Sequence, residues 1–258
     1  MVNTYWNMAS ASVRGFAHVH HKIVCQDKVK TAYINGIHVM ALADGMGSCF
    51  LSDIGAQIAV DSACTFIAEN FHVLTTLSAD RAIEDINSAV QEVLEEMANR
   101  LDVGLENLAS TLLVVAVCGN DTLAFHCGDG FIGLEKEDGT FKVVSKPYNT
   151  EGSKNITICM NEAYLEKMRI YKGITTGIKS FFIMSDGTSN RLYLEEGIML
   201  PEGQEANSFD SNILSKITNC FKVGNETMAC DLLTDILKEE IANYTNDDCS
   251  IAVMSVNN

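Results

Sequence analysis

Proline is the residue that this sequence most clearly lacks. The 258 residues contain only two prolines, Pro147 and Pro201, and no Gly/Ser-rich tract divides the chain. A flexible linker between two domains is therefore not indicated. Hydrophobic residues make up 47% of the chain and charged residues 20%, which is typical of a globular protein rather than a disordered or fibrous one. We expect residues 1–258 to form a single domain.

Basic residues are also scarce. Lysine and arginine total 18 against 34 aspartates and glutamates, which gives a formal net charge of −16. A surface of this charge repels nucleic acid and anionic membranes unless a dense basic patch offsets it, and the sequence contains no such run. We therefore expect neither a nucleic-acid nor a membrane partner. A pocket rich in carboxylates would, in contrast, need cations to be stable.

Long apolar runs and paired cysteines are missing as well. The longest apolar stretches run about eight residues, far short of the roughly 20 that a helix needs to cross a bilayer. The first residues do not show the basic and apolar pattern of a signal peptide. The nine cysteines are odd in number and form no C-x-x-C motif, which favours free thiols in a reducing compartment. These features predict a soluble, cytoplasmic protein.

Short β-prone runs joined by turn signals dominate the pattern. Asn35-Gly36 separates the apolar runs 31–34 and 37–43, and this dipeptide is a strong hairpin signal. Further strands are expected at 111–118, 122–127, 131–135, 140–144, 180–184 and 250–256, and helices at about 52–70, 78–101, 211–221 and 228–244. Because hairpins prevail over alternating βα units, we expect antiparallel sheets with helices packed outside, an α/β (α+β) class with sandwich character.

Aspartates recur at the ends of these expected strands, usually beside glycine. Asp44, Asp129, Asp186 and Asp247 share this context, and Asp27 is a fifth candidate near the first strand of the hairpin. Carboxylates that converge at one sheet edge repel each other unless cations join them. Hard ions such as Mg²⁺ or Mn²⁺ prefer oxygen ligands. Each Asp-Gly taken alone is more typical of a turn, so the prediction of a metal site depends on the whole set.

Taken in order, six short motifs resemble those of the metal-dependent protein phosphatases of type 2C, and in particular the compact bacterial-type members. The resemblance covers residues from about 12 to 256. The motifs are Cys25-Gln26-Asp27, Ala43-Asp44-Gly45-Met46-Gly47-Ser48, Ser110-Thr111, Cys127-Gly128-Asp129, Met184-Ser185-Asp186-Gly187 and Asp247-Asp248-Cys249-Ser250.

The resemblance implies an α-β-β-α sandwich in which helices flank two central antiparallel sheets. It also implies a flap beside the site at about 146–179, where the sequence pattern is weak and polar. In the implied metal site, Asp44 bridges two ions, the Gly45 carbonyl binds one of them, and Asp186 and Asp247 hold the other. A third, weaker ion would bind Asp129 together with Asp186, Asp27 would hold a metal-bound water, and Asp248 would support Asp247.

Two metal ions that share a water lower its pKa, so that hydroxide can attack a phosphorus atom in line. A general acid would help the alkoxide to leave, and histidine is a common choice for this role. His18, upstream of the Gln-Asp pair, is the candidate acid or phosphate contact. His38 and His126 lie inside strand runs and are expected to be structural.

The sequence therefore predicts a metal-dependent serine/threonine phosphatase that uses two Mn²⁺ or Mg²⁺ ions, with a third position. Its partner would be a phosphorylated protein, such as the target of a Ser/Thr kinase. Two other functions stay open at this point. One is a catalytically inactive, phosphatase-like binding or regulatory module. The other is a two-metal hydrolase of small phosphoesters.

Overall fold

The computed structural model describes residues 5–147, 158, 162–194 and 207–256. The predicted hairpin at Asn35-Gly36 is present, and it joins β2 (Asp27–Ile34) to β3 (Ile37–Asp44). Both turn residues have a positive φ, 51° and 86°, as a two-residue type I′ turn requires. The two long helices at residues 52–76 and 79–101 separate β3 from its antiparallel partner β4 (Leu112–Cys118), and a hairpin then joins β4 to β5 (Asp121–Cys127).

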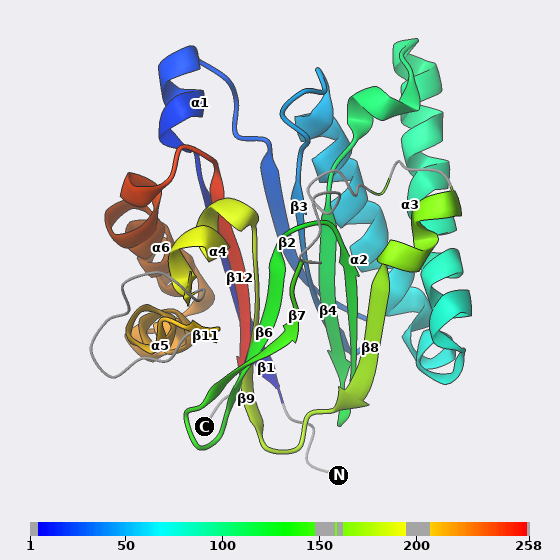
Figure 1. Ribbon diagram of the computed structural model, residues 1–258. Helices are drawn as coiled ribbons and strands as arrows, with labels where there is room; N and C mark the ends of the chain where they lie inside the picture. Colours follow the sequence, from blue (N-terminus) through cyan, green and yellow to red (C-terminus); the bar gives the residue numbers. More distant parts are fainter. Residues whose placement is uncertain (1–4, 148–157, 159–161, 195–206, 257–258) are drawn as a thin grey trace.

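These strands belong to the first of two five-stranded antiparallel sheets (Figure 1). The first sheet has the order β2-β3-β4-β5-β8, where β8 is Arg169–Ile174. The second sheet has the order β1-β12-β9-β6-β7. Its strands are β1 (Trp6–Val13), β12 (Cys249–Val256), β9 (Ile178–Met184), β6 (Phe131–Lys136) and β7 (Phe141–Ser145). A short pair, β10 (Tyr193–Leu194) and β11 (Ser208–Phe209), lies outside both sheets.

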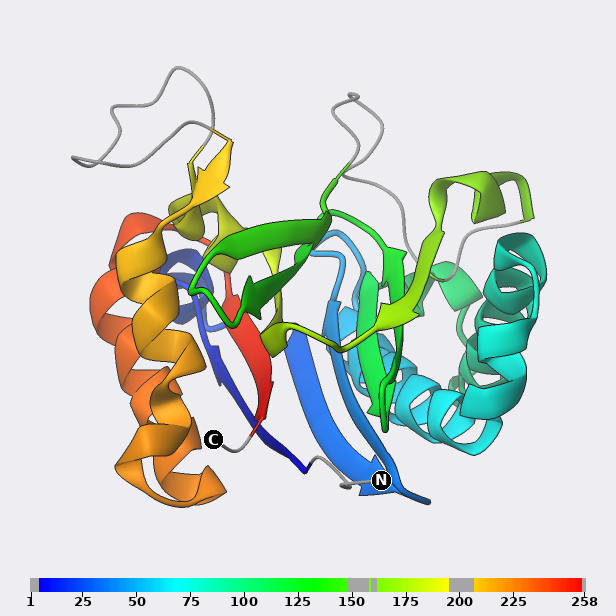
Figure 2. The ribbon, with the colours of Figure 1, turned by 90° about the horizontal axis from the view of Figure 1, so that it is seen from below.

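Helices cover the outer face of each sheet, as the view from below shows (Figure 2). Helices α2 (Ser52–Thr76) and α3 (Ala79–Leu101) pack on the first sheet. Helices α4 (Asp186–Leu192), α5 (Ser211–Thr218) and α6 (Glu226–Ile236) pack on the second. The sequence prediction of an α-β-β-α sandwich with two antiparallel sheets is confirmed.

Short helical turns complete the described chain. A six-residue helix, α1 (Phe16–His21), follows β1, and α6 continues into a π-turn, η5 (Leu237–Ile241). The 3₁₀ turns are η1 (Leu105–Leu108), η3 (Glu162–Lys167), η4 (Cys220–Val223) and η6 (Ala242–Tyr244). None of the helices in the described ranges has both the length and the apolar character that crossing a bilayer demands. The cysteines described there are free thiols.

The core consists of three apolar layers. One lies between the first sheet and α2–α3, and another lies between the second sheet and α4–α6. The third fills the space between the two sheets and contains Trp6, Met40, Leu113, Phe181 and Ile183, all at most 3% exposed. Because both faces of each sheet are covered, the central strands are apolar throughout. This explains why β3 and β4 read as continuous hydrophobic runs.

Several elements differ from the sequence prediction, which includes no helix at α4 and no strands at β10 and β11. Strand β1 was not predicted, because its sequence WNMASASV contains small polar residues among the buried Trp6, Met8, Ala9 and Ala11. Helix α1 was not predicted either, since it has no fully buried residue. Strand β8 is a partly exposed edge strand inside the segment of about 146–179 that we expected to be a flap. Residues 148–157 and 159–161 of that segment lie outside the described residues.

Candidate active site

The first sheet brings two aspartates together at one end. Asp27 begins β2 and Asp44 ends β3, and the register of the hairpin places them directly opposite each other. The motif Ser110-Thr111 fixes the backbone of Asp44. The Thr111 hydroxyl accepts a hydrogen bond from the Asp44 amide at 2.9 Å, and the Thr111 amide donates to the Asp44 carbonyl at 2.8 Å. Ser110 forms an isolated β-bridge with Gly45.

The second sheet supplies two more aspartates at the corresponding strand ends. Asp186 follows β9 and starts α4, and Asp247 lies just before β12, which pairs with β9. The Ser185 amide donates a hydrogen bond to the Ser250 carbonyl at 3.1 Å, and the Ser250 amide donates to the Ser185 hydroxyl, also at 3.1 Å. These two bonds join the end of β9 to the start of β12. A Cβ at Gly187 would approach the Asp248 carbonyl to 2.2 Å. The glycine of Ser-Asp-Gly is therefore required by this close contact of two backbones.

Four of the five predicted aspartates line one cavity of about 370 Å³. Asp129 joins the set from the loop between β5 and β6, which is one of the connections between the two sheets. The fifth, Asp27, is buried and only 2% exposed, and it is not part of the lining. The lining residues are His18, Gln26, Asp44, Gly45, Met46, Gly47, Ser48, Thr111, Asp129, Asp186 and Asp247.

The carboxylates of this cavity perturb one another strongly. Burial raises the pKa of Asp44 well above its usual range, and the charges of Asp27, Asp186, Asp247 and Asp129 raise it further, in that order. Burial also raises the pKa of Asp27 to about 7, and the Asp248 charge adds to the rise while the Ser250 and Ser185 hydroxyls oppose it. A cluster in which every carboxylate is ionised is thus unfavourable until cations compensate the charge.

The donor set fits hard divalent cations. It consists of carboxylate oxygens and the Gly45 backbone, with no cysteine in the cavity lining, and oxygen ligands are those that Mg²⁺ and Mn²⁺ prefer. Within the described ranges, no three histidine, cysteine, aspartate or glutamate side chains are grouped closely enough to hold a metal ion by themselves. The residues therefore fit ions that bind one or two carboxylates each and keep several waters.

Asp248 connects three separate parts of the site. Its buried carboxylate accepts hydrogen bonds from the Gly15 amide at 2.8 Å and the Gln26 amide at 2.7 Å, and it lies 3.0 Å from Nδ1 of His18. The Asp248 amide in turn donates to the Asp247 carboxylate at 2.9 Å. The contact has the distance of an ion pair but lacks the geometry of a hydrogen bond. Asp248 thus lies against His18 at the wall of the cavity.

Sequence reasoning underestimated Asp248 and the neighbouring Gln26. The Gln26 side chain donates to the Ser52 hydroxyl at 2.6 Å, and its carbonyl accepts from the Gly45 amide at 3.2 Å. Gln26 therefore ties the start of α2 to the end of β3. The only signal in the sequence was the adjacency of each residue to an aspartate, which does not reveal the long-range partners.

His126 lies next to the Asp129 loop but does not line the cavity. Its ring contacts the Ser145 hydroxyl and the Gly128 carbonyl, the latter at 3.0 Å. Burial lowers the pKa of His126 to about 3, and the charge of Arg169 adds to this effect. A neutral, hydrogen-bonded imidazole fits the structural role predicted for it. His38, whose ring accepts a hydrogen bond from the Trp6 amide at 3.4 Å, lies in β3 away from the cavity.

Comparison with known families gives a match over most of the chain. The sequence model of the family described as Protein phosphatase 2C matches residues 14–243. Among curated proteins, no sequence matches this chain.

Several solved structures share the fold. PppA, a key regulatory component of T6SS in Pseudomonas aeruginosa, is 17% identical with a TM-score of 0.63, and the match covers 99% of each chain. The serine/threonine phosphatase of S. agalactiae is 18% identical with a TM-score of 0.63, covering 98% of this chain and 100% of the other. RsbX in complex with magnesium is 12% identical with a TM-score of 0.56, and the match covers 100% of this chain and 98% of the other. At these identities the likeness concerns the fold.

Proposed function

Because the chain belongs to the protein phosphatase 2C family, we propose that it is a metal-dependent phosphatase that hydrolyses phosphoserine and phosphothreonine in proteins. The observation that carries this proposal is the convergence of Asp44, Asp129, Asp186 and Asp247 on one cavity. The substrate would be a phosphorylated protein, such as the product of a Ser/Thr kinase. We place the activity in the cytoplasm, which the free thiols of the described cysteines support.

In this proposal Asp44 and the Gly45 carbonyl would hold the first of two Mn²⁺ or Mg²⁺ ions, and Asp186 and Asp247 would hold the second. Asp129 and Asp186 would bind a third ion, and Asp27 would contact a bound ion through water. When bound, such ions activate a shared water for attack and neutralise charge on the phosphoryl oxygens.

His18 would act on the leaving group. With Asp248 at Nδ1, the ring is held in one orientation, and Nε2 is the nitrogen left for the substrate. A protonated imidazole in this position can give its Nε2 proton to the departing serine or threonine oxygen.

We further propose a single phosphatase domain over residues 1–258, with the segment of about 146–179 beside the site. The contacts of Ile158 support this placement. Its amide donates to the Ser110 carbonyl at 2.9 Å, and its carbonyl accepts from Gln91 Nε2 at 2.9 Å. Ser110 precedes Thr111, which lines the cavity. The part of the segment that can act as a flap precedes β8, since β8 belongs to the first sheet.

Phosphate release from a phosphothreonine peptide tests the proposal. We expect the full chain to release phosphate with Mn²⁺ and to lose this activity when the metal is chelated. Hydrolysis of a small aryl phosphate without any hydrolysis of phosphopeptides would instead indicate a small-phosphoester hydrolase.

A second function, an inactive binding or regulatory module, is favoured by one observation. No three metal-binding side chains of the described residues are grouped to hold an ion directly. Isothermal titration with Mn²⁺ separates the two functions. Binding of two or more ions together with phosphate release supports the phosphatase, whereas a protein that binds no Mn²⁺ and releases no phosphate is the inactive module.

A further inference from the structure

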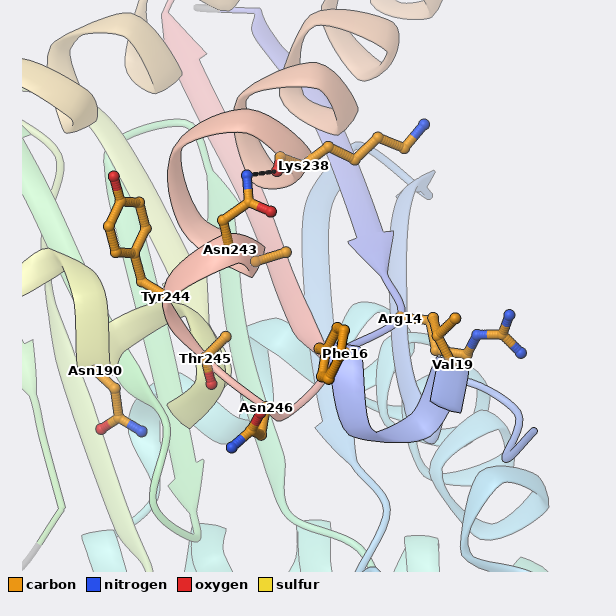
Figure 3. A pocket seen from close by; sticks show the side chains of 10 residues that line it. Arg14, Phe16, Val19, Asn190, Lys238, Asn243, Tyr244, Thr245 and Asn246 are labelled. Atoms are coloured by element: carbon orange, nitrogen blue, oxygen red, sulfur yellow. Dashed lines mark hydrogen bonds between the residues drawn. The ribbon is translucent and has the colours of Figure 1, made fainter. Parts of the chain in front are cut away.

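A second, larger cavity of about 810 Å³ is lined by residues that do not line the active-site cavity (Figure 3). We call it the α1 groove. Its walls come from the chain around α1, from α4, from the end of the helix that follows α6, and from the loop that leads to β12. Its lining residues are Arg14, Phe16, Val19, Asn190, Lys238, Ala242, Asn243, Tyr244, Thr245 and Asn246.

The α1 groove shares three structural elements with the active-site cavity. Helix α1 gives His18 to the active site and Phe16 to the groove. Helix α4 begins with Asp186 in the active site and carries Asn190 in the groove. The loop before β12 places Asn246 in the groove and the next residue, Asp247, in the active site. The two cavities are therefore lined by neighbouring residues of the same three elements.

The charge of the α1 groove is opposite to that of the whole chain. The chain has a formal net charge of −16, yet the described lining contains two cations, Arg14 and Lys238, and no carboxylate. In Figure 3 both side chains extend toward the same end of the groove, beyond Phe16. Arg14 uses one guanidinium nitrogen for the Ile23 carbonyl at 3.2 Å, and a guanidinium has further N–H groups for an anion.

The groove also exposes large apolar side chains. Phe16 is 68% exposed, Val19 is 50% exposed and Tyr244 is 71% exposed. The Arg191 guanidinium lies 5.2 Å from the centre of the Tyr244 ring. Exposed aromatic rings beside cations are characteristic of surfaces that bind peptides, because the rings supply contact area at low entropic cost.

We propose that the α1 groove binds the polypeptide around the phosphorylated residue, and that it selects acidic segments with an aromatic or large apolar side chain. Carboxylates of the segment pair with Arg14 and Lys238, and its apolar side chain packs on Phe16 and Val19. The selection of substrates by this groove rests on the proposed phosphatase function, but the binding of an acidic peptide does not.

Binding is therefore measured first, without metal and without hydrolysis. The probes are fluorescein-labelled peptides of one length that contain phenylalanine and either glutamates or lysines, and the readout is fluorescence anisotropy with the full chain. We expect the glutamate peptide to bind at least about tenfold more tightly than the lysine peptide. The double variant Arg14→Glu/Lys238→Glu should lose this preference, since it replaces attraction by repulsion at two exposed positions.

A second double variant, which serves as the control, changes the net charge of the protein by the same amount at positions outside the groove. Lys142 and Lys222 are exposed and lie outside both cavities, so Lys142→Glu/Lys222→Glu should retain the preference for the glutamate peptide. A similar loss in both double variants would show that the overall charge governs binding, and this overturns the proposal. Equal binding of the two peptides by the unchanged chain overturns it as well. Thermal melting verifies that each variant is folded.

Hydrolysis separates this proposal from the proposed function. With Mn²⁺, the ratio of kcat/KM for an acidic over a basic phosphothreonine peptide should fall about tenfold in Arg14→Glu/Lys238→Glu and stay constant in the control. If no phosphopeptide is hydrolysed but the anisotropy results hold, the phosphatase function fails while the α1 groove remains a peptide-binding site. If phosphopeptides are hydrolysed at a ratio that neither variant changes, the groove does not select substrates.

Discussion

The two sheets deliver their carboxylates to the site in different ways. In the first sheet, hairpins join β2 to β3 and β4 to β5, so Asp27 and Asp44 meet through a turn of two residues. In the second sheet, β1 and β12 come from the two ends of the described chain and pair along their full length, from Trp6 opposite Val256 to Val13 opposite Cys249. The aspartates of the first sheet therefore depend on pairing between strands that are neighbours in sequence. Those of the second sheet depend on pairing between strands from opposite ends of the described chain.

Asp248 joins the two sheets. It precedes β12 of the second sheet, and its carboxylate accepts hydrogen bonds from the Gln26 amide, which leads into β2 of the first sheet, and from the Gly15 amide, which follows β1. The four aspartates that line the cavity can therefore come together only when both sheets have formed and face each other. The predictions that follow test this dependence.

The largest expected effect is the loss of turnover in Asp44→Asn and Asp186→Asn, one from each sheet. A neutral amide cannot hold cations as a carboxylate does, so both variants should lose phosphate release on the order of 10³-fold. The exposed turn residue Asp138, which accepts hydrogen bonds from Thr140, provides the control Asp138→Asn. Near-normal turnover in Asp186→Asn, with loss in Asp44→Asn, would mean that the second sheet is not part of the metal site.

The next effect distinguishes Asp247 from Asp248. Asp247 is exposed and lines the cavity, so Asp247→Ala should lose metal affinity severely and keep its thermal stability. Asp248→Ala should lose about 2–4 kcal/mol of folding free energy, because two buried amides lose their acceptor, with a smaller, roughly tenfold loss of metal affinity. Calorimetric titration with Mn²⁺ and denaturant unfolding measure both quantities. The reverse ranking of metal affinities would assign the metal to Asp248.

The sequence reveals four of the five strands in each sheet and misses one strand in each, for different physical reasons. Hairpins with Asn35-Gly36 and continuous apolar runs carry their signal within a few residues. Strand β1 has weak alternation and is stabilised by β12, which lies more than 230 residues further along the chain, so no local pattern identifies it. Strand β8, at the exposed edge, was missed because charged residues such as Lys172 interrupt its apolar pattern.

The candidate site follows a similar division. The aspartates could be predicted from their places at strand ends, and four of them share the cavity. The acceptor role of Asp248 toward Gly15 and Gln26, and the α1 groove, could not be predicted, because both depend on contacts between segments far apart in sequence. Motifs identify which residues carry the chemistry. Only the tertiary structure shows how those residues are held.

A smaller effect concerns pH and the repulsion between the sheets. The pKa of Asp27 is raised from 3.8 to about 7, so the metal-free folded state binds a proton there that the unfolded state has already lost above pH 4. Stability should therefore fall as the pH rises from about 4 to about 7, by up to about 1.4 kcal/mol per pH unit from this group. The pKa of Asp44 is shifted in the same direction and adds to the slope.

Thermal melts of the chelator-treated protein between pH 4 and pH 8 measure this dependence. Asp27→Asn should flatten the slope and raise the melting temperature at pH 7, since an amide carries no charge toward Asp248 and Asp186 across the two sheets. Saturating Mn²⁺ should reduce the slope in the unchanged protein. A melting temperature that rises between pH 4 and pH 7 without metal would contradict the repulsion inferred for this cluster.

The smallest effect compares one tight turn from each sheet. Gly36 in the β2–β3 hairpin and Gly139 in the β6–β7 hairpin have positive φ values of 86° and 82°, and a Cβ at either position would meet no atom within 4 Å. The cost of Gly36→Ala and of Gly139→Ala is therefore only the backbone strain of a left-handed alanine, about 1 kcal/mol each. Because the turns are far from each other and from the cavity, the double variant should lose the sum of the two costs and keep its turnover. Urea unfolding and phosphate release check both points. A loss of stability much larger than the sum would show that the two hairpins are coupled through the layer between the sheets. The formation of a hairpin in one sheet would then not be independent of the other sheet.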